Sequence, residues 1–313
     1  MAWLKLIRWS NLLIVFLTQL LAWVCVILPI HQFNEVSFLL NAPNFLLLSL
    51  STVFIAAAGY IINDYFDIRI DNINRPEKMV LEKNIPRRMA IILHTSLNVI
   101  ALVLAGIVAR QAGAYGWLLL QLVCTLLLWF YSTHFKRAFM IGNVVVALLT
   151  ALTIVTLIIY EPAMHYYLGR AFFIEDGLPN PVWVLLVYTY FAFVLTWMRE
   201  IVKDMEDFKG DEAEGCVTMP IKWGLKKAEQ FTLFLGVFAV APLVIAGVNL
   251  LINRDWLLGI YSFAGLVIPI IWWMFFLPKA ATTAHYAKAS RGLKFIMVSG
   301  IGSLIIYYFQ ANA

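Results

Sequence analysis

Long apolar segments, most of them close to 20 residues, recur along the whole of this 313-residue chain. A helix of about 20 apolar residues crosses the hydrocarbon core of a bilayer, where each backbone polar group must be satisfied within the protein. The composition agrees, because 62% of the residues are apolar and only 13% are charged, against about 25% charged in an average soluble domain. The sequence therefore predicts an all-α, polytopic membrane protein.

Hydropathy predicts nine membrane-spanning helices in one domain, residues 1–313, with cytoplasmic loops capping one end. The helices are expected at residues 9–30, 43–66, 86–109, 116–133, 141–160, 181–201, 228–250, 255–277 and 291–309. Cys25, Cys124 and Cys216 have no paired spacing, so neither a disulfide framework nor a zinc site is indicated.

Basic residues are distributed unevenly among the connections of these helices. Of the 23 Lys and Arg residues, only Arg110, Arg170 and Arg254 fall on the side opposite the N-terminus. Because cytoplasmic loops are enriched in Lys and Arg, we expect an integral protein of the cell or inner membrane, with the N-terminus cytoplasmic and the C-terminus on the opposite side. The net charge of +5 suits contact with anionic membrane lipid. Its spread over short loops argues against nucleic acid, and no protein partner is indicated.

Acidic residues gather in two of the expected cytoplasmic connections. Thirteen of the 18 Asp and Glu residues lie in residues 64–82 and 200–229. Each segment carries three aspartates at i, i+3 and i+7, a spacing that places them on one face of a helix. The aspartates are Asp64, Asp67 and Asp71 in the first segment and Asp204, Asp207 and Asp211 in the second.

The two acidic segments also match each other. Asp64 and Asp204 begin the clusters at an offset of 140 residues, and a basic pair follows each cluster at the start of the next span. This pattern predicts an internal repeat with halves at about 1–135 and 136–313, each carrying one aspartate cluster. Repeats of this kind place a shared site where the two halves meet.

A divalent cation is the expected partner of these aspartates. Like charges on one helix face repel each other, and unpaired charge near a membrane is costly. The donors are all oxygen, including the Asn63 amide, which favours Mg²⁺, with Mn²⁺ as a substitute, over zinc or copper. The alternative is a salt-bridged surface, with Asp71 paired to Arg75 and Lys203 to Asp207. Such i,i+4 pairs contribute only about 0.2–0.5 kcal/mol each and leave most of the acid unneutralised.

Facing aspartate clusters with nearby Lys and Arg suggest a lipid diphosphate as substrate. Proteins typically hold Mg²⁺ with one or two carboxylates together with substrate phosphates. The metal would then stabilise charge on a diphosphate leaving group. Helices rich in aromatic residues, Leu and Met would surround an apolar tail, although any membrane bundle contains such helices.

Two other classes of protein share part of this pattern. A transporter also combines many spans, an internal repeat and membrane acids, but its helices usually break within the bilayer, whereas these acids lie at helix ends. The CDP-alcohol phosphotransferases also use aspartates and a metal, but they carry a single Asp-Gly-x-x-Ala-Arg element, which this sequence lacks.

The paired motifs resemble those of the UbiA superfamily of intramembrane prenyltransferases, and the resemblance covers most of the chain. It rests on Asn63-Asp64-x-x-Asp67-x-x-x-Asp71 and Asp204-x-x-Asp207-x-x-x-Asp211, with Arg8-Trp9-Ser10-Asn11 and Tyr131-Ser132-x-x-x-Lys136-Arg137 before Ile141-Gly142-Asn143 as further matches. It implies nine helices around a cavity, two Mg²⁺ ions and transfer of a prenyl group from its diphosphate to a lipophilic acceptor.

The resemblance also implies roles for individual residues. Asn63, Asp64, Asp67 and Asp71 would hold one Mg²⁺ and the diphosphate, and Asp204, Asp207 and Asp211 the second ion. Lys136 would contact diphosphate oxygens, or else anchor a helix end at the membrane surface. The catalytic set is thus Asp67, Asp71, Asp207, Asp211 and Lys136, and the expected substrate-binding residues are Arg8, Asn11, Asn63, Arg75, Tyr131, Lys136, Asn143 and Lys203.

Within this superfamily the motif detail is most similar to archaeal-type geranylgeranylglycerol-phosphate geranylgeranyltransferases. The stretches concerned are Ile73-Asn74-Arg75-Pro76, Arg199-Glu200-Ile201-x-Lys203-Asp204-x-Glu206-Asp207-x-x-Gly210-Asp211 and Thr218-Met219-Pro220-Ile221. Such enzymes alkylate a glycerol hydroxyl to form an ether, with geranylgeranyl diphosphate as donor. The chain departs from the family pattern at Lys78, Met79 and His134, where a substrate would be gripped.

The sequence therefore leaves the identity of the acceptor undecided. The main alternative to a glycerol hydroxyl is an aromatic acceptor of quinone synthesis. If the acceptor is a hydroxyl, a base must take its proton. Glu206 and His94 are candidates, although a helix-surface carboxylate and a helix-packing histidine are the simpler interpretations of these two residues.

Overall fold

The computed structural model describes residues 2–30, 38–172 and 179–311, and within these ranges nine helices are long and apolar enough to cross a membrane. The spans are Trp9–Ile30, Ala42–Phe66, Arg87–Gln111, Tyr115–Thr133, Ile141–Tyr160, Pro181–Glu206, Leu225–Ile252, Trp256–Lys279 and Thr283–Gln310. The predicted all-α architecture with nine spans is confirmed. The central cavity and the division into two halves stay predictions.

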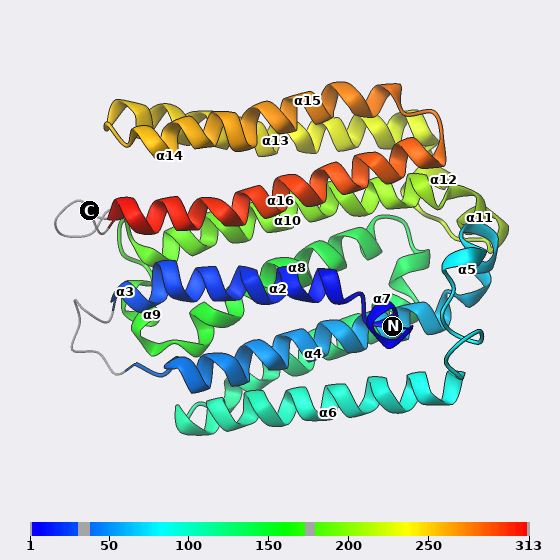
Figure 1. The fold of residues 1–313 in the computed structure, drawn as a ribbon, viewed down its shortest axis with the longest axis horizontal. Helices are drawn as coiled ribbons and strands as arrows, with labels where there is room; N and C mark the ends of the chain where they lie inside the picture. Colours follow the sequence, from blue (N-terminus) through cyan, green and yellow to red (C-terminus); the bar gives the residue numbers. More distant parts are fainter. Residues whose placement is uncertain (1, 31–37, 173–178, 312–313) are drawn as a thin grey trace.

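Figure 1 labels the elements that form these spans. The longer helices are α2 (Trp9–Ala22), α4 (Ala42–Phe66), α6 (Arg87–Gln111), α7 (Leu118–Thr133), α8 (Ile141–Tyr160), α10 (Pro181–Glu206), α13 (Leu225–Ile252), α15 (Ile268–Phe276) and α16 (Thr283–Ala311). The shorter helices are α1 (Ala2–Leu6), α3 (Leu28–Ile30), α5 (Ile68–Asn74), α9 (Pro162–Tyr167), α11 (Phe208–Ala213), α12 (Met219–Trp223) and α14 (Trp256–Tyr261).

The long helices run along a common direction, and α10 lies at the centre of the packing. It contacts α8 on one side and α13 and α16 on the other, while α4 packs against α6, α7 and α2. One buried apolar cluster joins α10 to α2, α4 and α8, and a second joins it to α13, α15 and α16. Residues of α10 thus connect the two halves of the apolar core.

The ends of the bundle differ. The N-terminus, α5, α11 and α12 gather at one end in Figure 1, and the C-terminus and α9 lie at the other. Large apolar side chains on the periphery are exposed, as at Phe275 (69%) and Phe295 (79%). This surface is the expected one for a bundle solvated by lipid.

The last helix begins earlier than hydropathy indicates, at Thr283 instead of residue 291. Its first turns carry charged side chains, which lower the mean hydropathy of this stretch, so hydropathy places the start of the helix too late. Tyr286, Ala289, Ser290 and Leu293 are nevertheless buried. Their i, i+3, i+4, i+7 spacing forms one amphipathic face against the bundle. The sixth span likewise continues beyond residue 201 to Glu206.

Candidate active site

Both aspartate-rich segments bend at their middle aspartate. Helix α4 ends at Phe66 and α5 begins at Ile68, and α10 and α11 are divided in the same way around Asp207. Asp67 has φ −88° and ψ 0°, and Asp207 has φ −93° and ψ 6°. This sparsely populated backbone region recurs at active sites. Each aspartate triad therefore spans two helices, and the predicted shared face is divided at its middle aspartate.

The two bent segments meet at the end of the bundle, where α5 and α11 lie side by side (Figure 1). The Asn74 amide donates to the Asp207 carbonyl at 3.1 Å and accepts from the Gly210 N–H at 2.9 Å. A β-carbon at Gly210 would lie 2.4 Å from the Asn74 side chain. Glycine is therefore what allows the two segments to approach this closely.

Arg75 completes the contact between the segments. Its guanidinium pairs with the carboxylates of Asp207 and, at 3.0 Å, Glu206. The local pairs weighed from sequence, Asp71 with Arg75 and Lys203 with Asp207, are not what the structure shows. Arg75 instead reaches the other segment, and Lys203 pairs with Glu200 at 2.9 Å.

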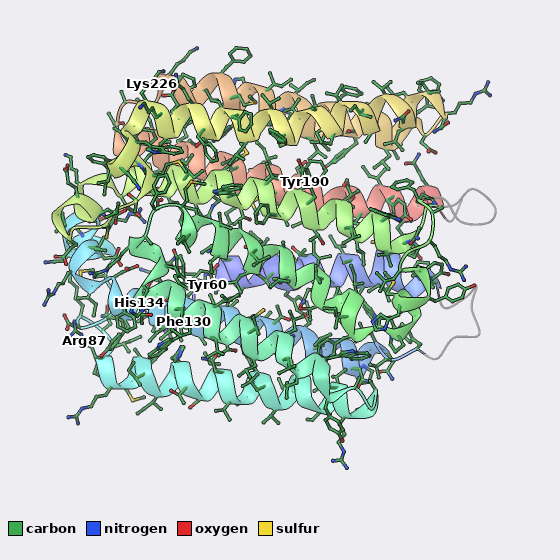
Figure 2. The ribbon with its side chains drawn as sticks, turned by 180° about the vertical axis from the view of Figure 1, so that it is seen from behind. Tyr60, Arg87, Phe130, His134, Tyr190 and Lys226 are labelled. Carbon is green, nitrogen blue, oxygen red and sulfur yellow. The ribbon has the colours of Figure 1, made fainter. Side chains whose placement is uncertain are left out.

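The first acidic cluster is held by side chains from three elements. Lys136, in the turn after α7, pairs with Asp67, and the Asn63 amide donates to the same carboxylate at 2.6 Å. Arg8, just before α2, pairs with Asp64 at 2.6 Å and lies over the ring of Tyr60, which Figure 2 labels within the bundle. Asp67 is only 5% exposed. Lys136 is thus placed at a carboxylate and not at a membrane surface.

The second cluster is less neutralised. Asp204 accepts a hydrogen bond from the Asn143 amide of α8 at 2.8 Å. Asp211 is 3% exposed, and Lys136 and Asp207 are its nearest charged influences. Since Lys136 acts on Asp71 and Asp211 as well as on Asp67, one lysine links the two clusters electrostatically.

Burial and mutual repulsion make these carboxylates hold protons. Burial, together with the Asp67 charge, raises the pKa of Asp71 to about 6. Burial and the charges of Asp207 and Asp67 raise the pKa of Asp211 to about 7, against the opposing effect of Lys136. Burial favours the neutral amine of Lys136, but the charge and hydrogen bond of Asp67, together with Tyr131 and Asp211, outweigh burial and raise the pKa of this lysine. The site therefore carries a cation beside excess acid.

The donor set fits a hard divalent cation in chemistry. Carboxylate and amide oxygens line both clusters, and the buried Asn63 Oδ1 has no hydrogen-bond partner in the described residues. No three His, Cys, Asp or Glu side chains of that part of the chain converge as a ready-made metal centre. Lys136 and Arg75 occupy the carboxylates that ions would share. The oxygen ligands are thus present but paired with basic side chains.

Two further predicted site residues, Tyr131 and Asn11, lie close to different basic side chains. Tyr131, on the last turns of α7, is near enough to Lys136 to interact with it electrostatically. Asn11 accepts a hydrogen bond from Lys294 of α16 at 2.6 Å. Sequence reasoning did not assign a role to Lys294, or to Arg199 beside Glu200. Two basic residues one turn apart in an apolar span, at positions 199 and 203, could have indicated a functional site, because charge within a membrane span is costly.

Two of the three departures from the family pattern, His134 and Met79, have described side chains. His134 is exposed, hydrogen bonds Thr133 at 2.7 Å and packs on Phe130, as Figure 2 shows near the end of α7. Met79 packs against a small apolar cluster that includes Ile68 and Leu81. The side chain of Lys78 is outside the described part of the chain. We therefore expect the substitution at His134 to have little influence on the site.

Neither candidate base is placed for proton transfer. Both ring nitrogens of His94 are engaged, Nδ1 with the Ala58 carbonyl at 3.0 Å and Nε2 with the Asn98 amide at 3.2 Å. Glu206 is ion-paired with Arg75. The simpler interpretation as a packing histidine describes the contacts of His94, whereas the Glu206 side chain is only 11% exposed and is not a surface carboxylate.

Comparisons with known proteins agree with this geometry. The model of the UbiA prenyltransferase family matches residues 33–298. A protein of Methanothermobacter thermautotrophicus named digeranylgeranylglyceryl phosphate synthase is 34% identical over 72% of this chain and 68% of its own. A Saccharolobus solfataricus protein of the same name is 30% identical over 85% of this chain and 86% of its own. With the namesake from Methanosphaera stadtmanae, 32% identical, the match spans 61% of this chain but only 63% of that protein.

Solved structures show the same fold. One solved structure, which concerns the biosynthesis of digeranylgeranylglyceryl phosphate synthase in membranes, matches this chain with a TM-score of 0.64 at 27% identity. The match covers 99% of this chain and 97% of that one. A UbiA homolog from Archaeoglobus fulgidus, bound to GPP and Mg²⁺, has a TM-score of 0.57 at 14% identity, covering 97% of this chain and all of that one. At that identity the second likeness concerns the fold alone.

Proposed function

Since this chain belongs to the UbiA prenyltransferase family, we propose that it is the member that transfers a geranylgeranyl group from its diphosphate to the hydroxyl of geranylgeranylglyceryl phosphate. The product is an ether lipid. The relatives that carry the name digeranylgeranylglyceryl phosphate synthase support this acceptor. The observation that carries the proposal is the meeting of the two aspartate clusters around Lys136 and Arg75 at one end of an apolar bundle.

The chain's own residues would bind and orient the donor. Lys136 would contact diphosphate oxygens, with Tyr131, Asn143 and Arg75 nearby. Asn63 with the first three aspartates, and Asp204 with Asp207 and Asp211, would hold two Mg²⁺ ions. Such ions supply Lewis-acid stabilisation of charge on the leaving diphosphate. A homolog of the same fold from A. fulgidus binds GPP and Mg²⁺, which is consistent with a prenyl diphosphate and a divalent cation as ligands of this fold.

In the reaction, the bond between C1 of the prenyl chain and the diphosphate oxygen breaks, and the acceptor oxygen attacks C1. The diphosphate leaves with the bonding electrons, and the hydroxyl proton passes to a basic oxygen at the site. Asp211 is buried and Asp204 is half-buried, so little water would reach the region where the charge develops. The apolar bundle would hold both isoprenoid tails.

The protein is integral to the membrane, and we propose that the end bearing α5 and α11 is cytoplasmic. This end collects most of the Lys and Arg residues of the loops, and such loops remain in the cytoplasm. The acceptor phosphate and the diphosphate are both charged, so they would reach the site from this side.

The test is product formation by protein purified in detergent, with radiolabelled geranylgeranyl diphosphate and Mg²⁺. Separate reactions receive geranylgeranylglyceryl phosphate or dihydroxynaphthoate. Label in a doubly prenylated glycerol phosphate is the expected result. Label only in the aromatic acid would move the protein to quinone synthesis, and absence of turnover in any reaction would favour a transport role.

A further inference from the structure

Two basic side chains of α10 share one carboxylate, and a third basic side chain, Lys294 of α16, lies within their electrostatic influence. Arg199 and Lys203 lie one turn apart on α10 and both pair with Glu200, at 3.1 and 2.9 Å. Lys294 projects from α16 close enough to be repelled by Arg199, and its hydrogen bond is to the neutral amide of Asn11. Helix α16 packs against both α10 and α2.

This basic cluster, defined as Arg199, Lys203 and Lys294, carries more positive charge than its surroundings neutralise. Glu200 is 6% exposed and is the carboxylate that the cluster shares. Arg8, the next cation, is already paired with Asp64. In the described residues Lys294 has no ion-pair partner, and the buried Nε of Arg199 has no hydrogen-bond partner.

Such an excess of positive charge within membrane-spanning helices is costly and marks a functional site. Partly buried donors without partners are costly too. An anion bound between Arg199 and Lys294 would relieve both costs. Both ion pairs of Glu200 lie within α10, so they do not fasten this helix to a neighbour.

The basic cluster is separate from the groups assigned to the donor diphosphate. Lys136 and Arg75 serve the aspartates, whereas Arg199 and Lys294 do not contact them in the structure. The separation is nevertheless short, because Lys203 directly precedes Asp204 in α10. A second anion would therefore bind beside the same helix as Asp204 without sharing the cations of the donor.

We propose that the basic cluster binds the phosphate monoester of the acceptor lipid, with Lys294 and Arg199 as specificity-determining residues. The inference rests on the proposed function, in which both substrates carry phosphate. Two phosphate-bearing groups repel each other, so bringing the acceptor hydroxyl to C1 of the donor requires a second cationic site. Arg supplies a planar fork for phosphate oxygens, and Lys a mobile point charge.

The experiment compares turnover of geranylgeranylglyceryl phosphate with that of the same lipid lacking its phosphate. The variants are Lys294→Met and Arg199→Gln. Lys288→Met is the matched control, because Lys288 is exposed on the same helix and contacts only the ring of Phe276 among the described groups. Lys294→Arg keeps the charge and tests rescue.

Wild-type protein should prefer the phosphorylated acceptor strongly in kcat/KM. Each charge-removing variant should raise KM for this acceptor about 10- to 100-fold, as expected for a lost charge-assisted hydrogen bond. KM for geranylgeranyl diphosphate should change little. Turnover of the lipid without phosphate should be unaffected, so the preference for phosphate should collapse. Lys294→Arg should restore most of it, and Lys288→Met should behave as wild type.

A binding measurement makes the inference independent of turnover. With EDTA and no donor, the phosphorylated acceptor should raise the unfolding temperature of wild type and Lys288→Met, but not of Lys294→Met. An unchanged preference for phosphate in both variants would overturn the inference while leaving the proposed function intact. Failure of wild-type protein to use or bind either glycerol lipid would instead overturn the proposed function.

Discussion

Arg75 of the first aspartate-rich segment forms an ion pair with Asp207 of the second, although 132 residues separate them in the sequence. The Asn74 amide reinforces this contact by bonding the backbone on both sides of the bend, at Asp207 and Gly210. These contacts hold the two halves of the site together. We expect Arg75 to exchange partners when a metal ion binds Asp207, because the two cations compete for the same carboxylate.

The contact between α5 and α11 should fail when a methyl group is added at Gly210. In Gly210→Ala the β-carbon would lie 2.4 Å from the Asn74 amide nitrogen, so Asn74 must move and its two hydrogen bonds should be lost. We expect destabilisation of about 1–3 kcal/mol and a large loss of kcat. The measurements are apparent unfolding temperature in detergent and turnover. Gly106→Ala is the control, because its β-carbon approaches no atom closer than 3.9 Å. Equal behaviour of the two variants would contradict the packing argument.

Removing single charges from the middle aspartates should abolish turnover. Asp67→Asn and Asp207→Asn keep the size of the side chain but remove the ligand charge, and loss of one such transition-state interaction typically lowers kcat by about 10²–10³. Glu212→Gln tests the specificity of the effect, because Glu212 is exposed and adjoins Asp211 on α11. Normal activity in either aspartate variant would show that the clusters do not carry the chemistry.

Lys136 should be required for binding the diphosphate but not for binding the metal ion. In the structure Lys136 neutralises Asp67. In Lys136→Met, Mg²⁺ would no longer compete with the lysine ammonium for this carboxylate. We expect Mg²⁺ to bind at least as tightly as in wild type, while affinity for geranylgeranyl diphosphate falls about 10-fold or more. Calorimetric titration of each ligand separates the two effects. Arg137→Met, which removes an exposed charge one residue away, should leave both affinities unchanged. Weaker Mg²⁺ binding in Lys136→Met would contradict this role.

Much of the architecture follows from local sequence patterns. Apolar runs of bilayer length predicted the nine spans, because a lipid-exposed helix must be apolar around most of its surface. The same rule missed the start of α16, where Lys288 and Arg291 occupy the exposed face of a helix that buries Tyr286 and Leu293. Hydropathy averages over a window and does not distinguish the two faces.

The aspartate clusters were found from their spacing, but their partners were not. The i, i+3, i+7 pattern is compatible with a straight helix, and nothing local indicates the bends at Asp67 and Asp207. Arg75 lies four residues from Asp71, yet it pairs across the bundle. The contact between Lys294 and Asn11 joins the last span to the first. Such pairings depend on tertiary packing, which a pattern along one segment does not encode.

The raised pKa values of Asp71 and Asp211 predict how pH changes the stability of the metal-free protein. In the unfolded chain both carboxyls ionise near pH 3.8, whereas in the folded protein they hold protons up to about pH 6 and about pH 7. Between pH 5.5 and 8 the folded state therefore binds more protons than the unfolded state. Stability from these groups is present at low pH and is lost as pH rises through their folded-state pKa values.

In EDTA, the apparent unfolding temperature should consequently fall from pH 5.5 to pH 8. A pKa difference of one corresponds to about 1.4 kcal/mol, and about 1 kcal/mol moves the midpoint of a protein of this size by about 2–4 °C, so the fall should be several degrees. Asp211→Asn should flatten this dependence, since the uncharged amide has no proton to lose. Added Mg²⁺ should stabilise wild type more at pH 8 than at pH 5.5, because protons compete with the ion for the same oxygens. A Mg²⁺ effect that is equal at both pH values would show that the ion does not bind these two carboxylates.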